Sequence, residues 1–224
     1  MNGKKTYLLL VHFKNNHQFK PLLTIPGETD TLEVVQETKL LGYWLTTDMK
    51  PSKHISYITS IANKRMWALC KQKSSGVSNS DIKEFYIVKI RSVLETAAPV
   101  FHSMMNLEDT EDMERIQKNV VRLIMGEKYT NYEGGLEILG LETLLDRRTQ
   151  LCLQFALKCL NNEKYKDWFQ PTPINDHDFR KEIPKFLEPQ CQTERYKNSP
   201  IVYLTRILND YFFKQANLTD LIRY

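Results

Sequence analysis

The sequence predicts an α+β protein that is mostly α, with a small antiparallel N-terminal sheet followed by a helical bundle and further C-terminal helices. Short runs of β-branched and aromatic residues, bounded by turn-forming residues, are concentrated in the first fifty of the 224 residues. From Pro51 onward, apolar residues instead recur every three to four positions, which is the helical period. Hydrophobic residues make up 42% of the chain and charged residues 26%, so the composition is that of a folded globular protein.

Three runs in the N-terminal region, at 6–13, 32–36 and 39–45, predict strands, and a turn-rich segment at 25–30 separates the first two. A sheet of three such short strands is not stable alone. We therefore expect residues 1–50 to pack against the helices that follow or against a part that this chain does not contain.

Three helices are predicted to form a bundle over residues 51–126. The first has an apolar face that runs from Ile55 to Leu69. The second begins at Ser78, three residues before an aspartate, as in a capping box, and Pro99 is expected to kink or end it. The third ends at Gly126, a residue suited to an αL C-cap.

A further helical region is predicted over 127–169, and its main helix, expected at 141–160, is the longest periodic stretch of the sequence. Proline is dense in 170–195, which predicts an extended linker, and one more amphipathic helix is expected in 196–224. The predicted core face of the helix at 141–160 comprises Leu141, Leu144, Leu145, Cys152, Phe155, Ala156 and Cys159.

The net charge of +4 conceals two regions of opposite sign. Residues 50–91 carry nine basic and two acidic side chains, whereas residues 103–146 carry ten acidic and four basic ones. The four cysteines contain no CxxC pair, and the polar N-terminus with its very short apolar stretch fits neither a signal peptide nor a membrane span. We therefore expect an intracellular protein with reduced thiols and no membrane partner, located in either the nucleus or the cytoplasm.

Motifs of catalytic, metal and cofactor sites are absent. The sequence contains no GxGxxG, GxxxxGK[ST], HExxH or GxSxG, and its five histidines lack metal-ligand spacing. The carboxylates at 108–114 lie where a helix is expected to begin, so we interpret them as capping residues that favour the helix dipole. The sequence predicts no catalytic residue, no metal site and no cofactor.

Several segments, taken in order along the chain, carry short motifs. Residues 90–102 read IRSVLETAAPVFH, residues 114–118 read ERIQK, and residues 139–148 read LGLETLLDRR. Shorter pieces are Asn2, Lys5 and Thr6, the run LGYWL at 41–45, residues 53–65, the tripeptide at 124–126, and NSPIVYL at 198–204. In order and spacing these segments resemble the end of the palm, the thumb and the downstream region of non-LTR (LINE-like) retrotransposon reverse transcriptases.

This resemblance implies part of an RNA-directed DNA polymerase without its catalytic centre. In that family two metal ions are held by palm aspartates, some of them in an F-x-D-D hairpin, because two cations must clamp the attacking and leaving oxygens. The present sequence has no Asp-Asp pair. We therefore expect a 5′-truncated C-terminal fragment that is not an enzyme by itself. Thr96 and Phe101 depart from the family's signature and concern the packing of the thumb.

The family's thumb holds the primer–template duplex, a task that needs cationic side chains facing phosphates. The resemblance therefore implies a possible RNA or RNA/DNA partner for the basic region at 50–91, although solvation of an amphipathic bundle is the alternative role for each basic residue. A second stripe, formed by Arg115, Lys118 and Arg122, is expected to pair with neighbouring acids. The candidate backbone contacts are Lys53, Lys64, Arg65, Lys71, Lys73, Lys89 and Arg91, and the candidate stacking or packing residues are Tyr57 and Trp67.

A helical protein-interaction module, retained by a host and without a nucleic-acid function, is the alternative reading. Its partner would be a protein, just as a fragment's partner could be the missing palm and fingers. Affinity for nucleic acid that falls steeply with salt separates the two readings. A translated relic without any activity is a third possibility.

Overall fold

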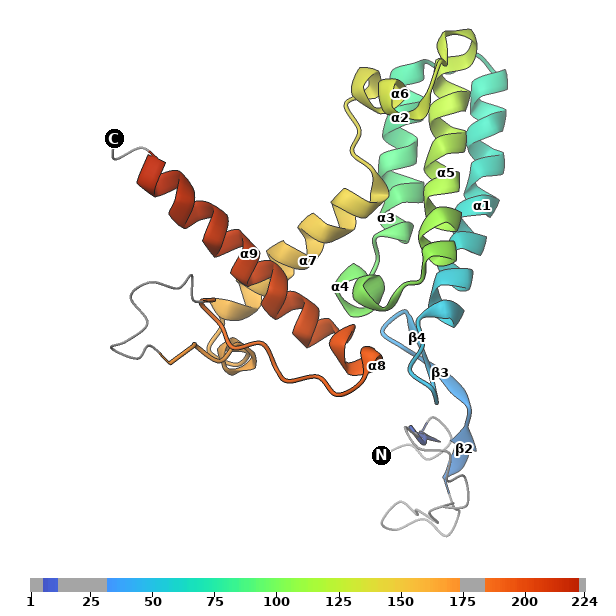
Figure 1. Cartoon of the computed structure of the whole chain (residues 1–224). Coiled ribbons are helices and arrows are strands. Elements are labelled where there is room, and N and C mark those ends of the chain that lie inside the picture. The colour runs from blue at the N-terminus through green and yellow to red at the C-terminus, as the bar shows by residue number, and fades with distance from the viewer. Residues whose placement is uncertain (1–5, 12–31, 174–183, 222–224) are drawn as a thin grey trace. The chain divides into compact units, whose positions relative to one another are not determined.

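The structure, a computed structural model, describes residues 6–11, 32–173 and 184–221, with side chains described as far as Gln215 (Figure 1). The α+β, mostly helical class is confirmed. The chain divides into two compact units, residues 1–61 and 62–224. This division falls inside the first helix and differs from the expected boundary at residue 50.

In its described residues, the first unit has four short strands and the start of the first helix. They are β1 (Tyr7–Leu9), β2 (Glu33–Val35), β3 (Glu37–Leu40), β4 (Tyr43–Thr46) and α1 (Ser52–Ser74). The expected small antiparallel sheet is confirmed as the β3–β4 pair. The expectation that all the N-terminal strands share that sheet was wrong, because β1 and β2 form a separate, parallel pair. The run at 39–45 is not one strand, since Leu41 and Gly42 both have positive φ (49° and 93°) and make the turn of a hairpin. The turn-rich segment at 25–30 lies outside the described residues.

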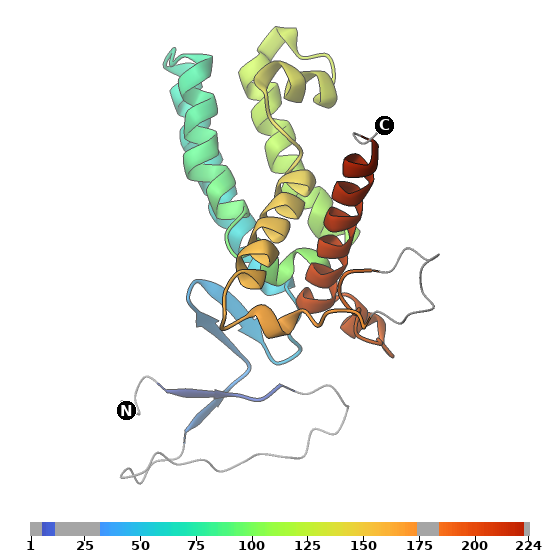
Figure 2. The same ribbon diagram turned by 90° about the vertical axis from the view of Figure 1, so that its left-hand side faces the viewer.

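The second unit is built from helices. It contains the rest of α1, α2 (Asn79–Phe85), the π-helix η2 (Tyr86–Arg91), α3 (Ser92–Leu94), α4 (Ala98–Phe101), α5 (Leu107–Met125), α6 (Tyr132–Leu139), α7 (Leu144–Leu160), α8 (Glu194–Lys197) and α9 (Pro200–Leu221). The 3-10 turns are η3 (His102–Met104), η4 (Gly126–Lys128) and η5 (Lys166–Trp168). Figure 1 shows α5 running beside α2, and α9 crossing α7, while in Figure 2 α7 and α9 again lie side by side.

Local capping explains where two helices of this unit begin. Ser78 is the N-cap of α2, and its hydroxyl accepts from the backbone N–H of Asp81, as the sequence predicted. Asn106 and Asp109 form a reciprocal capping box at the start of α5, which confirms the capping role of an acidic residue in the cluster at 108–114. Gly126 ends α5 with a positive φ of 55°, although its ψ of −126° lies outside the αL region that we expected.

A π-helix interrupts the second predicted helix. The buried residues here follow one another at every fourth position, which turns the stripe about 40° per step around an ideal α-helix. The wider turn of η2 offsets this drift and keeps the stripe facing the core. Its members are Ile82, Tyr86, Ile90, Leu94 and Ala98. Helix α3 ends at Leu94, and Pro99 lies in the first turn of the next helix, α4, after Ala97 at φ 61°.

Helix α7 differs from the prediction in its start and its buried face. It begins at Leu144, not Leu141, because Thr143 caps it, and with 17 residues it is shorter than α1, which has 23. Leu145 and Phe155, placed in the core by the sequence, are 47% and 38% exposed. The buried face instead runs through Leu144, Arg148, Cys152, Ala156 and Cys159.

The region expected to be an extended linker is packed where the structure describes it. Pro171 and Phe186 form an isolated β-bridge, and Phe186 lies in a core cluster with Leu204 and Leu208. The Asn209 side chain accepts from the Phe186 N–H at 2.8 Å and donates to its carbonyl at 2.9 Å. The described ends of 170–195 therefore form a strap on α7 and α9, while residues 174–183 lie outside the described part.

Candidate nucleic-acid interface

Lys64, Trp67 and Lys71 form an exposed stripe on α1, which we call the α1 stripe. They occur at positions i, i+3 and i+7 and therefore share one side of the helix. Trp67 is 68% exposed, and the Lys71 ammonium lies 5.7 Å from the centroid of its ring. Within the described part of the chain, neither lysine forms an ion pair with a carboxylate. Two free cations beside an accessible aromatic ring can contact phosphates and stack on a base.

Arg65 and Lys89 lie next to this stripe and connect α1 to η2. The Arg65 guanidinium is half-buried and donates a hydrogen bond to the backbone carbonyl of Lys89, whose side chain is exposed. Arg65 therefore ties two helices together, and of these two residues Lys89 is the one whose side chain is accessible to a ligand.

Two further basic candidates of the second unit are engaged within the chain. The Arg91 guanidinium, with its side chain 14% exposed, lies 3.5 Å from the Glu95 carboxylate. The Lys73 ammonium donates to the Asn79 side-chain oxygen at 2.5 Å. Each would have to give up a partner to contact a phosphate.

Lys53 and Tyr57 belong to the first unit and contact the β3–β4 hairpin. The Lys53 ammonium lies 3.1 Å from the Glu37 carboxylate and 5.4 Å from the Trp44 ring centroid. Tyr57 accepts a hydrogen bond from Lys39 and packs against the edge of Trp44 at a centroid distance of 6.1 Å. The structure thus brings together Lys64, Trp67 and Lys71, with Lys89 nearby, out of the nine predicted residues.

The second predicted stripe, on α5, is also engaged. Arg115 forms an ion pair with Asp112 at 2.9 Å, as expected for a basic residue with acidic neighbours. The other two members instead lie over aromatic rings, Lys118 over Tyr132 and Arg122 over Tyr129, each at 5.4 Å.

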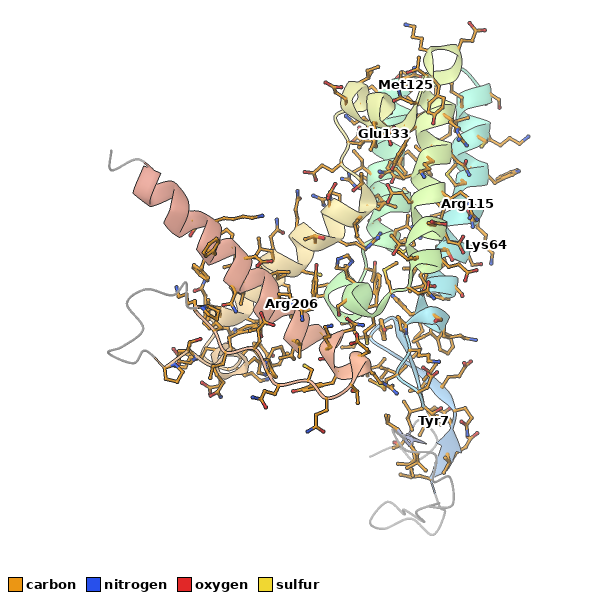
Figure 3. The ribbon with its side chains drawn as sticks, in the orientation of Figure 1. Tyr7, Lys64, Arg115, Met125, Glu133 and Arg206 are labelled. Atoms are coloured by element: carbon orange, nitrogen blue, oxygen red, sulfur yellow. The ribbon has the colours of Figure 1, made fainter. Side chains whose placement is uncertain are left out.

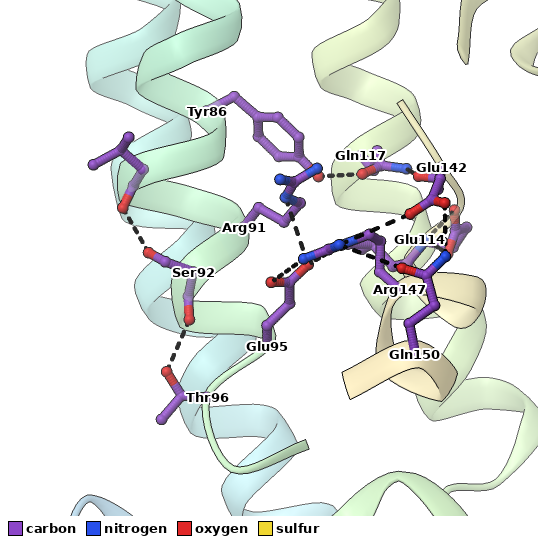
Figure 4. A network of polar contacts seen from close by, with 12 residues as sticks. Tyr86, Arg91, Ser92, Glu95, Thr96, Glu114, Gln117, Glu142, Arg147 and Gln150 are labelled. Atoms are coloured by element: carbon purple, nitrogen blue, oxygen red, sulfur yellow. Dashed lines mark hydrogen bonds and ion pairs between the residues drawn. The ribbon is translucent and has the colours of Figure 1, made fainter. Parts of the chain in front are cut away.

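A polar network that the sequence did not predict joins the segment from η2 to Glu95 with α5 and the start of α7 (Figure 4). Glu95 accepts two hydrogen bonds from Arg147, from Nε at 3.1 Å and from Nη2 at 3.3 Å. These bonds raise the pKa of Arg147 above its usual value. Arg147 also lies 3.8 Å from the Glu142 carboxylate, so it joins the end of the π-containing helix to the start of α7.

Gln117 is the buried centre of the same network. Its side-chain oxygen accepts from the Tyr86 hydroxyl, and its nitrogen donates to the Tyr132 oxygen at 2.8 Å and to the Glu142 carbonyl at 2.9 Å. Tyr132 in turn donates to Glu114. Burial raises the pKa of both tyrosines, and both hydroxyls remain protonated donors.

A second polar cluster surrounds His102 in the same unit. Its Nδ1 accepts from the buried Arg148 Nε at 3.4 Å, so Nε2 carries the proton and faces the Tyr203 hydroxyl at 3.1 Å and the Thr149 hydroxyl at 3.3 Å. Burial, with a smaller effect of the Arg148 charge, lowers the pKa of His102 to about 4. The two terminal nitrogens of Arg148 have no hydrogen-bond partner among the described residues, and burial lowers its pKa too.

These contacts join segments that the sequence showed only as separate motifs. Glu95 and His102 come from the segment at 90–102, and they meet Arg147 and Arg148 from the segment at 139–148. Tyr203 comes from the segment at 198–204. Sequence reasoning selected the segments but not the contacts, since a choice of partners across fifty or a hundred residues carries no local signal.

Among the residues described, every helix is too short or too polar to span a bilayer, and no group of three His, Cys, Asp or Glu side chains is arranged to hold a metal ion. Comparisons with models of protein families, with curated proteins and with solved structures found no match to this chain.

Proposed function

We propose that this chain corresponds to the palm end, thumb and downstream helices of a non-LTR retrotransposon reverse transcriptase. In this proposal it binds RNA or an RNA/DNA duplex through the phosphate backbone and does not polymerise. The α1 stripe is the proposed contact, with Lys64 and Lys71 facing phosphates and Trp67 stacking or packing beside them.

The contacts between the motif segments are the observation that carries the family part of the proposal. The polar side chains of the segments at 90–102, 114–118 and 139–148 bond to one another rather than facing solvent. Short motifs that match a family by chance are not expected to contact one another in the fold, whereas motifs retained from one folded domain are. This supports reading the segments as parts of one ancestral unit.

The exposed, unpaired state of the α1 stripe supports the binding part. Most other basic candidates have partners within the chain, but Lys64 and Lys71 keep their full charge available to a ligand. Contacts of this kind are independent of base sequence and release counterions, so their affinity depends on salt.

A salt titration tests this proposal. Fluorescence anisotropy with a labelled RNA/DNA duplex is expected to show binding that weakens about 40-fold between 50 and 200 mM salt if three phosphates are contacted. The double variant K64E/K71E should lose most of this affinity. The matched control K158E/K214E makes the same charge change at exposed positions of α7 and α9 and should bind like the parent.

Two results would overturn the binding proposal. One is affinity that does not change with salt, and the other is an equal loss in the control and in K64E/K71E. A primer-extension assay with Mg²⁺ or Mn²⁺ tests the absence of polymerisation, and reproducible nucleotide incorporation would contradict it.

A further inference from the structure

A groove with an apolar floor and acidic walls lies between α6 and the start of α7. Its volume is about 580 Å³, and the buried Leu136 and Leu141 form its floor. The residues that line it include four carboxylates and no lysine or arginine. These are Glu133, Glu137, Glu142 and Asp146.

Two of the four carboxylates are available to a ligand. Glu142 accepts from Gln150 at 2.7 Å, and Asp146 accepts from Thr143 at 2.6 Å, so both already have partners. Glu133 and Glu137 lie one turn apart on α6, and their side chains form no hydrogen bond or ion pair with the described residues. Two like charges on adjacent turns of a helix repel each other, and a cation bound between them would relieve this repulsion.

The α1 stripe matches this groove in charge and in apolar character. It offers two ammonium groups without carboxylate partners on either side of an exposed indole, while the groove offers two free carboxylates above a leucine floor. A tryptophan with flanking cations is a typical anchor at protein interfaces, because it buries a large apolar area while its charged neighbours pair at the rim.

The stripe and the groove cannot meet within one molecule. Lys64 and Glu133 lie on opposite sides of the group of helices α1, α2, α5 and α6 in Figure 3, and Figure 2 shows α1 and α6 well separated in a perpendicular view. Complementary surfaces on opposite sides of one body bind head to tail, so each copy can engage two others.

We propose that the groove between α6 and α7 binds the α1 stripe of a second copy of this chain. Trp67 of one copy lies on the leucine floor of the next, and Lys64 and Lys71 pair with Glu133 and Glu137. The association is heterologous, so it extends to oligomers larger than a dimer. It uses the stripe that the proposed function assigns to nucleic acid, and self-association and nucleic-acid binding therefore compete.

Two charge-reversed variants test this pairing without a ligand. K64E/K71E keeps an intact groove, and E133K/E137K keeps an intact stripe. In sedimentation velocity at low salt, nuclease-treated wild-type protein is expected to form a concentration-dependent series of oligomers. Each variant alone should associate about tenfold more weakly than wild type. An equimolar mixture of the two should associate about as strongly as wild type, because the intact stripe of one variant fits the intact groove of the other and the two reversed surfaces are also opposite in charge.

A mixture that stays monomeric, or wild-type protein that stays monomeric at the highest attainable concentration, overturns the inference. So does association in both separate variants that is as strong as in the wild type. Circular dichroism shows whether each variant is folded, and W67A, which keeps every charge, should also weaken association.

The failure of this inference is distinguishable from failure of the proposed function. E133K/E137K should lose self-association but keep nucleic-acid binding, whereas K64E/K71E should lose both. A wild type that binds nucleic acid but never oligomerises would reject only the proposed role of the groove. A wild type that oligomerises, but binds no nucleic acid when diluted to monomers, would reject only the proposed function.

Discussion

Glu95 and Arg147 lie 52 residues apart in the sequence and are joined by two hydrogen bonds, Nε to Oε1 and Nη2 to Oε2. The Glu95 side chain is only 14% exposed and also faces Arg91, so one carboxylate balances two guanidinium groups. The pair connects the helix that contains η2 to α7. Its planar, two-point geometry sets the orientation of these elements as well as their proximity.

Removing the Glu95 charge should therefore destabilise the second unit. Glu95→Gln leaves both arginines without their shared counter-charge, and we expect the free energy of unfolding to fall by about 2 kcal/mol, the scale of hydrogen bonds to charged groups. Urea unfolding followed by circular dichroism measures this change. Asp112→Asn, which removes the partner of the exposed Arg115, is the control and should cost less than about 0.5 kcal/mol. Equal losses in the two variants would contradict a special role for Glu95.

Gly135 allows α5 and α6 to approach closely. A Cβ atom at this position would lie 2.4 Å from Cγ1 of Val121, much closer than van der Waals contact. Gly135→Ala should lower stability by about 1–3 kcal/mol, because the two helices must move apart.

A double variant tests whether this clash causes the loss of stability. Val121→Ala removes the methyl group that the new side chain would meet, so Gly135→Ala should cost less in that background than in the wild type. Thermal melting followed by circular dichroism gives the cost of Gly135→Ala in each background. If the two costs are equal, the clash is not the cause.

The π-helix η2 should tolerate the loss of one residue. Deleting the half-exposed Val88 lets this turn adopt α-helical geometry and changes the spacing of the buried stripe toward the α-helical period. We expect a folded protein with a modestly lower melting temperature, measured by circular dichroism.

Deletion of Asn119, an exposed residue of the regular helix α5, is the control. It would rotate the following buried residues by about 100° away from the core, so this variant should fail to fold. A Val88 deletion that unfolds as completely as the Asn119 deletion would show that the π-turn is required.

His102 should make stability depend on pH below neutrality. Its pKa is lowered from 6.5 to about 4, mainly by burial, so the unfolded chain binds a proton in this interval that the folded chain does not. Stability should therefore fall as pH decreases from about 6.5 to about 4. At pH 5 the loss from this group should approach about 2 kcal/mol.

The comparison of wild type with His102→Gln isolates this effect. Glutamine keeps hydrogen-bonding capacity beside Arg148 and Tyr203 but does not titrate, so its stability should decline less between pH 7 and pH 5. Urea unfolding at the two pH values measures both slopes, and parallel slopes would rule out His102 as the titrating group.

The local features of the fold could be read from the sequence because their partners lie within a few residues. The Ser78 cap, the acidic start of α5 and the apolar face of α1 depend on spacings of three or four positions. Lys64, Trp67 and Lys71 could be selected as candidates in the same way, from the basic and aromatic residues at short spacings along α1. Which of the neighbouring basic residues have partners within the chain could not be read this way. The acceptor of Arg65 is a backbone carbonyl 24 residues away, and the Glu95 carboxylate that faces Arg91 is also held by Arg147, 52 residues further along the chain.

The sequence by itself determined the helical class, the cap at Ser78, the acidic start of α5, the two-signed charge distribution and the order of the motif segments, since all of these follow from residue type and short spacing. Only the tertiary structure decided that Arg148 rather than Leu145 is buried on α7, that the segment after Phe169 packs as a strap, and that Glu95 meets Arg147. The physical reason is that a helix has several faces capable of burial. Which face is buried depends on the total free energy of its contacts with elements far away in the chain, and this total cannot be predicted from a local sequence pattern.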